Sequence, residues 1–147
     1  MRKDDAHMFT ITISPLTREL LLCAAQGMPD RQAMISIMDH KRDCKQRYPA
    51  PRVLRLCFDD AVDTLFWQNL MTLEQARAIR DFVLQYQDEI DELIVHCTEG
   101  VSRSAAVAAG ILIGCGCDDT WIWNDPRYRP NKYVYALVRE AFAESGL

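Results

Sequence analysis

A short apolar run at residues 93–96, Leu-Ile-Val-His, passes through a polar loop into an alanine-rich segment that ends at Gly114. So short an apolar run is typical of a buried strand that is covered on both faces. The alanine-rich segment begins near Arg103 and has apolar residues on nearly every side, which predicts a buried helix. The chain therefore places a tight loop between the carboxyl end of a buried strand and the first turn of a buried helix.

Three further segments have the pattern of strands. Residues 8–14 alternate apolar residues with threonines, which predicts a strand with one buried face. The apolar, partly β-branched runs at 33–38 and 53–58 predict two more strands, and the polar, proline-bearing stretch between them predicts a loop.

Helices are expected between these strands. Ser14 followed by Pro15 is a typical helix start, and Gly27 suits the end of that helix. Thr72 and Gln75 form a capping box before an amphipathic helix, whose apolar positions are Ala76, Ile79, Val83, Tyr86 and Ile90. A last amphipathic helix carries Val134, Leu137, Val138, Ala141 and Phe142. Alternation of strands and helices predicts an α/β fold, a three-layer sandwich with a mostly parallel sheet of about four or five strands and helices on both faces.

Composition limits the classes of function. The chain has 147 residues with no repeat or linker, so residues 1–147 are expected to form a single domain. A net charge of -4 argues against a nucleic-acid or acidic-membrane partner. Neither a leader nor a long apolar span is apparent, so we expect a cytoplasmic monomer whose six cysteines, at 23, 44, 57, 97, 115 and 117, are reduced.

The loop after the strand at 93–96 suits an anion. Backbone N–H groups in a tight loop and the positive end of the following helix together attract negative charge. Gly100 lets the loop turn, and Arg103 offers a planar fork that matches two phosphate oxygens. The same field lowers the pKa of the Cys97 thiol, so that a thiolate would lie beside a bound phosphate as a nucleophile.

Residues 96–104, His-Cys-Thr-Glu-Gly-Val-Ser-Arg-Ser, resemble the signature of the cysteine-dependent protein tyrosine phosphatases. That signature is His-Cys, five residues, Arg and then Ser or Thr. With a chain this short, the sequence is most similar to the dual-specificity branch, and especially to its small bacterial members. The strand at 53–58 with the aspartates after it, the capping-box helix and the stretch Pro-Arg-Tyr-Arg-Pro-Asn at 126–131 extend the resemblance.

The resemblance implies a phosphocysteine mechanism without metal or cofactor. Cys97 would attack phosphorus, and Ser104 would stabilise the departing thiolate. His96 would support the loop without reacting. The oxygens of the phosphoryl group would be held by the Arg103 side chain and by the backbone of Thr98, Glu99, Gly100, Val101, Ser102 and Arg103. The substrate would be a phosphorylated protein, at tyrosine first with serine or threonine also allowed, or a small phosphomonoester.

An aspartic acid should protonate the leaving oxygen. The Trp-Pro-Asp tripeptide of the best-known tyrosine phosphatases is absent from the sequence. In dual-specificity members the acid follows a strand some three dozen residues before the cysteine, where this chain has Asp59, Asp60 and Asp63. Alignment with that strand and loop favours Asp60, although such clusters are also common turn residues.

The sequence also allows other interpretations. A rhodanese-like sulfurtransferase also uses a loop cysteine at a strand end, and a catalytically silent phosphate-binding module would keep the loop without the acid. Cys57 is either a small packing residue or a thiol that traps oxidised Cys97. An aromatic group (Trp121, Trp123, Tyr128 and Tyr133) is expected to pack rather than to line a pocket, and a basic group (Arg127, Arg129 and Lys132) either holds substrate or is solvated.

Overall fold

The computed structural model describes residues 9–15, 30–39, 52–61 and 69–145. Its strands are β1 (Thr10–Ser14), β2 (Gln32–Met38), β3 (Val53–Cys57) and β4 (Glu92–His96). Its helices are α3 (Leu73–Tyr86), α4 (Arg103–Gly114), α5 (Thr120–Trp123) and α6 (Lys132–Glu144).

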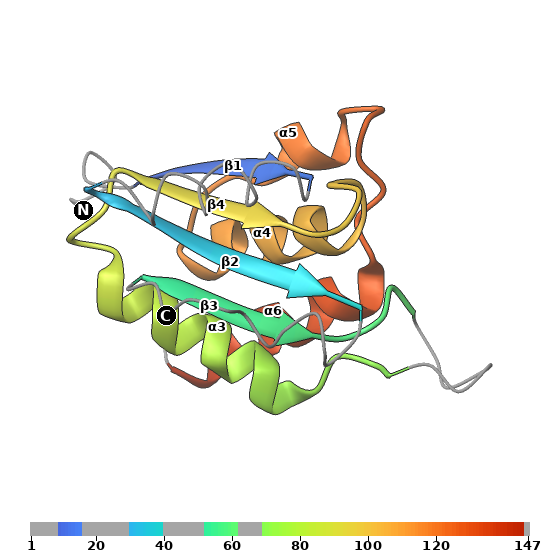
Figure 1. Cartoon of the computed structure of the whole chain (residues 1–147), viewed down its shortest axis with the longest axis horizontal. Helices are drawn as coiled ribbons and strands as arrows, with labels where there is room; N and C mark the ends of the chain where they lie inside the picture. Colours follow the sequence, from blue (N-terminus) through green and yellow to red (C-terminus); the bar gives the residue numbers. More distant parts are fainter. Residues whose placement is uncertain (1–8, 16–29, 40–51, 62–68, 146–147) are drawn as a thin grey trace.

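The four strands form one sheet in the order β1-β4-β2-β3, and every pair is parallel (Figure 1). The strand β4 lies between β1 and β2, so that it is paired on both sides. His96, its last residue, is level with Ser14 of β1 and Ser36 of β2. The loop that follows β4 therefore leaves the middle of the sheet at its carboxyl edge, where open α/β sheets bind ligands.

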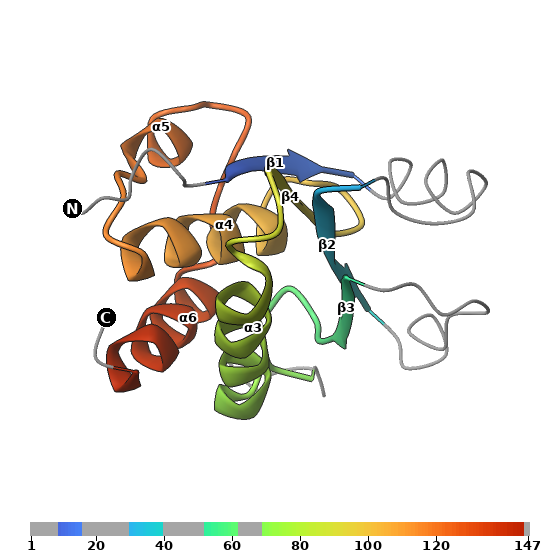
Figure 2. The same ribbon diagram turned by 90° about the vertical axis from the view of Figure 1, so that its left-hand side faces the viewer.

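Helices α3, α4 and α6 cover one face of this sheet (Figure 2). The helix α4 approaches α6 closely, because a Cβ built on Gly110 would lie 2.7 Å from the Val138 Cβ. At Gly114 a Cβ would lie 2.4 Å from Cγ of Phe142. Because glycine has no Cβ, both positions allow this close approach of the two helices. This contact anchors α4, and with it the loop that enters α4.

These elements confirm the α/β class and the parallel sheet. Thr72 and Gln75 form the expected capping box, with the backbone N–H of Gln75 donating to the Thr72 hydroxyl over 3.1 Å. The helix they begin ends at Tyr86, and Ile90 is buried in the turn that follows. The helix expected between Pro15 and Gly27, and with it the cover of the other face of the sheet, falls outside the described residues.

Candidate active site

The loop from Cys97 to Ser102 connects β4 to α4. Gly100 has a φ of +71°, a backbone conformation that L side chains rarely adopt. A Cβ at this position would also lie 2.9 Å from the Pro15 nitrogen and 3.0 Å from the Ser14 carbonyl carbon. The glycine therefore lets the loop turn tightly while it packs against the end of β1.

The thiol of Cys97 lies at the bottom of this loop and is 2% exposed. Its Sγ receives the backbone N–H of Gly100 at 3.3 Å and that of Ser104 at 3.5 Å, and the Ser104 hydroxyl lies 3.2 Å away. Burial acts to raise the pKa of the thiol. The Ser104 hydroxyl, the two N–H groups and the charge of Arg103 act in the opposite direction and prevail, so the pKa lies below its ordinary value.

Arg103 is 6% exposed, and its guanidinium is held on one side. Nη1 donates to the carboxylate of Asp39 and, over 2.9 Å, to the carbonyl oxygen of Phe58. Nη2 lies 3.4 Å from the Thr98 hydroxyl, and among the described residues no acceptor reaches Nε. The edge formed by Nε and Nη2 is thus the one left for an anion, and a guanidinium edge binds two oxygens of one anion.

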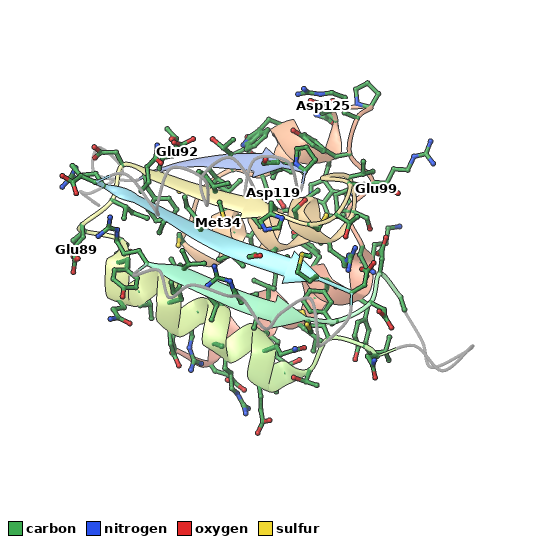
Figure 3. The ribbon with its side chains drawn as sticks, viewed as in Figure 1. Met34, Glu89, Glu92, Glu99, Asp119 and Asp125 are labelled. Atoms are coloured by element: carbon green, nitrogen blue, oxygen red, sulfur yellow. The ribbon has the colours of Figure 1, made fainter. Side chains whose placement is uncertain are left out.

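A cavity of about 580 Å³ opens over this loop. Its lining is mostly polar or charged: Asp39, Asp59, Asp60, Cys97, Thr98, Glu99, Val101, Ser102, Arg103 and Arg129. Figure 3 shows Glu99 at the end of the sheet to which the strand arrows point. The structure therefore gathers the expected nucleophile, the expected arginine and two of the three expected aspartates around one space.

His96 lies beneath the loop rather than in the cavity. It is fully buried, and its Nε2 is 2.6 Å from the hydroxyl of Ser36. This contact links the end of β4 to β2 at the point where the loop begins.

The two described candidates for the acid have different partners. Oδ1 of Asp60 accepts the Ser102 hydroxyl at 2.9 Å and the side-chain amide of Asn131 at 2.9 Å. Asp59 uses its Oδ2 to accept the backbone N–H of Asn69 at 2.7 Å. Asp60 is therefore bound to the loop itself, whereas the Asp59 carboxylate binds the backbone of Asn69. Asp63 lies outside the described residues.

Sequence reasoning missed two residues of this site, Asp39 and Asn131, and allowed two interpretations of a third, Arg129. Asp39 follows the predicted strand β2 and pairs with Arg103, but nothing in its local sequence indicates that contact. Arg129, for which the sequence allows either substrate binding or solvation, lines the cavity, and its backbone N–H donates to the Val101 carbonyl over 2.9 Å. Asn131 precedes a predicted helix, so an N-cap was readable from the sequence, but its contact with Asp60 was not.

The aromatic residues named from the sequence do not line the cavity. Trp123 packs against Tyr135 with ring centroids 5.0 Å apart, and the Tyr133 hydroxyl donates to the Met71 carbonyl over 3.3 Å. The contacts of Trp123 and Tyr133 agree with the expected packing role. Trp121 does not, because 44% of it is exposed.

The cysteines correct one expectation. Cys97, Cys115 and Cys117 are free thiols, but Cys57 is disulfide-bonded. The prediction that all six cysteines are reduced is therefore wrong at Cys57. Since Cys97 is free, the structure contains no bridge between these two residues. Burial and the neighbouring Cys117 raise the pKa of Cys115 to about 11, which leaves that thiol protonated near neutrality.

No protein-family model and no curated protein matches this sequence. Solved structures do match over most of their length. PTPMT1 in complex with PI(5)P has a TM-score of 0.55 at 18% identity, over 92% of this chain and 91% of that one. Tk-PTP in its active form has a TM-score of 0.55 at 15% identity, over 92% of each chain. Human DUSP28 has a TM-score of 0.52 at 19% identity, over 92% of this chain and 93% of that one.

The chain therefore has the fold of the small dual-specificity and tyrosine phosphatases. This finding confirms the fold that the resemblance at residues 96–104 implies. Among the described residues, no helix has the length and apolar character needed to cross a bilayer.

Proposed function

We propose that this chain, as one domain, is a phosphomonoester hydrolase of the protein tyrosine and dual-specificity phosphatase type. One observation carries the proposal: the buried Cys97 sulfur receives two backbone N–H groups at 3.3 and 3.5 Å beside a buried guanidinium. This arrangement suits a thiolate that attacks a dianion held directly above it.

In the first step, the Cys97 thiolate attacks phosphorus, so that an S–P bond forms while the P–O bond to the leaving group breaks. Asp60 gives its proton to the departing oxygen. The Nε and Nη2 edge of Arg103, with the N–H groups from Thr98 to Arg103, holds the three equatorial oxygens. The product alcohol leaves, and the phosphoryl group stays on sulfur.

In the second step, water replaces sulfur on phosphorus. Asp60, now ionised, accepts a proton from the water as its oxygen bonds to phosphorus. The S–P bond breaks and the electron pair returns to Cys97. The Ser104 hydroxyl, 3.2 Å from this sulfur, stabilises the departing thiolate, and inorganic phosphate is released.

Asp39 has a supporting part in this scheme. Its carboxylate and the Phe58 carbonyl occupy Nη1 of Arg103. An arginine held at one corner keeps its other edge directed at the anion, which lowers the cost of ordering it when substrate binds.

For the substrate, we propose a phosphorylated protein, at tyrosine first and at serine or threonine next, or a small phosphomonoester. The polar lining of the cavity supports a hydrated, charged group at its floor. Because PTPMT1 was solved in complex with PI(5)P, a phosphoinositide belongs in the substrate panel.

The test compares wild type and Cys97→Ser on p-nitrophenyl phosphate. We expect the wild type to turn over and the variant to lose on the order of 10⁵-fold or more in kcat, as covalent enzymes do without their nucleophile. Activity retained by the variant would exclude Cys97 as nucleophile. An inactive wild type that still binds vanadate would favour a silent phosphate-binding module, and sulfur transfer from thiosulfate to cyanide would favour the sulfurtransferase.

A further inference from the structure

Asn131 is held in one orientation by the helix that it precedes. It is 7% exposed, and its Oδ1 accepts the backbone N–H groups of Tyr133 at 3.0 Å and Val134 at 3.1 Å. These contacts make it the N-cap of α6, a position where asparagine is strongly preferred. Because Oδ1 faces the helix, the Nδ2 amide group must face the opposite way.

That amide group faces the segment that carries Asp60. Nδ2 donates to Oδ1 of Asp60 over 2.9 Å and to the carbonyl oxygen of Ala61 over 3.1 Å. The backbone N–H of Asn131 donates to the Ser102 carbonyl over 3.2 Å. A single buried residue thus joins three parts of the site: the start of α6, residues 97–102 (the anion-binding loop) and residues 58–61 (the acid segment).

The contacts at Asp60 also distinguish its two oxygens. Ser102 and Asn131 both donate to Oδ1, each over 2.9 Å. In the part of the chain that the structure describes, no donor contacts Oδ2. An oxygen that accepts two hydrogen bonds is a poor place for a proton, so protonation of this carboxyl falls on Oδ2.

We propose that Asn131 is the positioning residue for the general acid, and that it fixes Asp60 with Oδ2 as the oxygen that delivers the proton. This inference rests on the function proposed above. The first turn of α6 fixes the Asn131 side chain, and Asn131 fixes Oδ1 of Asp60. The acidic hydrogen of Asp60 is then carried by Oδ2. General acid catalysis depends on such geometry, because a displacement of about 1 Å can cost roughly 10²-fold in rate.

Two substitutions separate this positioning from the capping of α6. Asn131→Ser and Asn131→Asp both retain a good N-cap, since serine and aspartate rank with asparagine there. Serine lacks the amide donor, and aspartate replaces that donor with an acceptor beside the Asp60 carboxyl. Asn124→Ser is a matched control, because Asn124 is exposed at the end of α5.

The measurement is single-turnover cleavage of two aryl phosphates. Phenyl phosphate has a poor leaving group that needs a proton, whereas 2,4-dinitrophenyl phosphate has a good leaving group that departs without one. We expect both Asn131 variants to lose roughly 10- to 100-fold on phenyl phosphate and less than about 3-fold on the dinitrophenyl ester. The loss should be larger for Asn131→Asp, and the Asn124→Ser control should match wild type on both.

Equal losses on the two esters would overturn the inference, because they would indicate a structural role. Unchanged rates on phenyl phosphate would overturn it as well. A thermal unfolding midpoint close to that of wild type shows that each variant folds. If Asp60→Asn has the leaving-group dependence and neither Asn131 variant does, this inference fails while the proposed function stands; an active Cys97→Ser protein would instead defeat both.

Discussion

The anion-binding loop and the acid segment are built in different ways. The loop runs from Cys97 to Ser102 between a central strand and a buried helix. The contacts at its sulfur come from Gly100 in the loop and from Ser104 in the first turn of that helix, so all are close to Cys97 in the sequence. The acid segment, residues 58–61, follows the edge strand β3. Asp60 is held by Ser102 and Asn131, which are 42 and 71 residues away in the sequence, and Asp59 by Asn69, which is 10 residues away.

In the proposed mechanism, this difference separates binding of the anion from protonation of the leaving group. The loop would supply the contacts to phosphorus and its oxygens, which every substrate needs. The acid segment would supply one proton, which matters in proportion to how poorly the leaving group departs. Substitutions in the loop should therefore reduce the rate for all substrates, and substitutions in the acid segment should discriminate among them.

Among substitutions that compare the two regions and keep the nucleophile, the largest effect is expected at Arg103. Arg103→Lys keeps the charge but loses the planar edge for two oxygens and the simultaneous contacts to Asp39 and Phe58. We expect kcat/KM to fall by roughly 10²–10³-fold, about the same on good and poor leaving groups. Steady-state kinetics on the two aryl phosphates measure it. A loss confined to the poor leaving group would contradict the separation of the two regions.

At Asp60 we expect a smaller and selective effect. Asp60→Asn should slow cleavage of phenyl phosphate by roughly 10²-fold or more, while the dinitrophenyl ester changes little. Asp59→Asn is the matched control one residue earlier, because the Asp59 carboxylate binds the backbone of Asn69. Should Asp59→Asn give the larger selective loss, the acid has been assigned to the wrong neighbour.

The same difference explains what the sequence could predict. Residues 96–104 follow one another between a strand and a helix, so their spacing alone predicts which side chains meet. The capping box at Thr72 and the helix that starts at Arg103 are likewise local, and both are confirmed. The fold class followed from the order of such local elements.

Contacts between distant segments were not predictable in this way. Asp39 contacts Arg103 because β2 lies next to β4. The order of strands in a sheet cannot be predicted from the sequence of any single strand. Asn131 reaches Asp60 because α6 begins beside the loop. Cys57 was expected to be a reduced thiol but is disulfide-bonded. The residues next to it in the sequence do not indicate a partner for such a bond.

The smallest effect concerns the charge of the sulfur. Burial raises the pKa of Cys97, while the Ser104 hydroxyl, the N–H groups of Ser104 and Gly100, and Arg103 lower it to below its ordinary value. Ser104→Ala removes the side chain that makes the largest of these favourable contributions. We therefore expect the pKa of the thiol to rise, and the loss of thiolate at neutral pH to slow alkylation.

The pH dependence of iodoacetamide alkylation measures this directly. In the wild type the rate should rise through a midpoint below that of an ordinary thiol, about 8.5, and the midpoint for Ser104→Ala should lie higher. Ser102→Ala is the matched control, because its hydroxyl contacts Asp60 rather than the sulfur. If both variants move the midpoint equally, the Ser104 contact is not what stabilises the thiolate. The charge of the sulfur would then depend on both regions, and anion binding and proton transfer would not be separate.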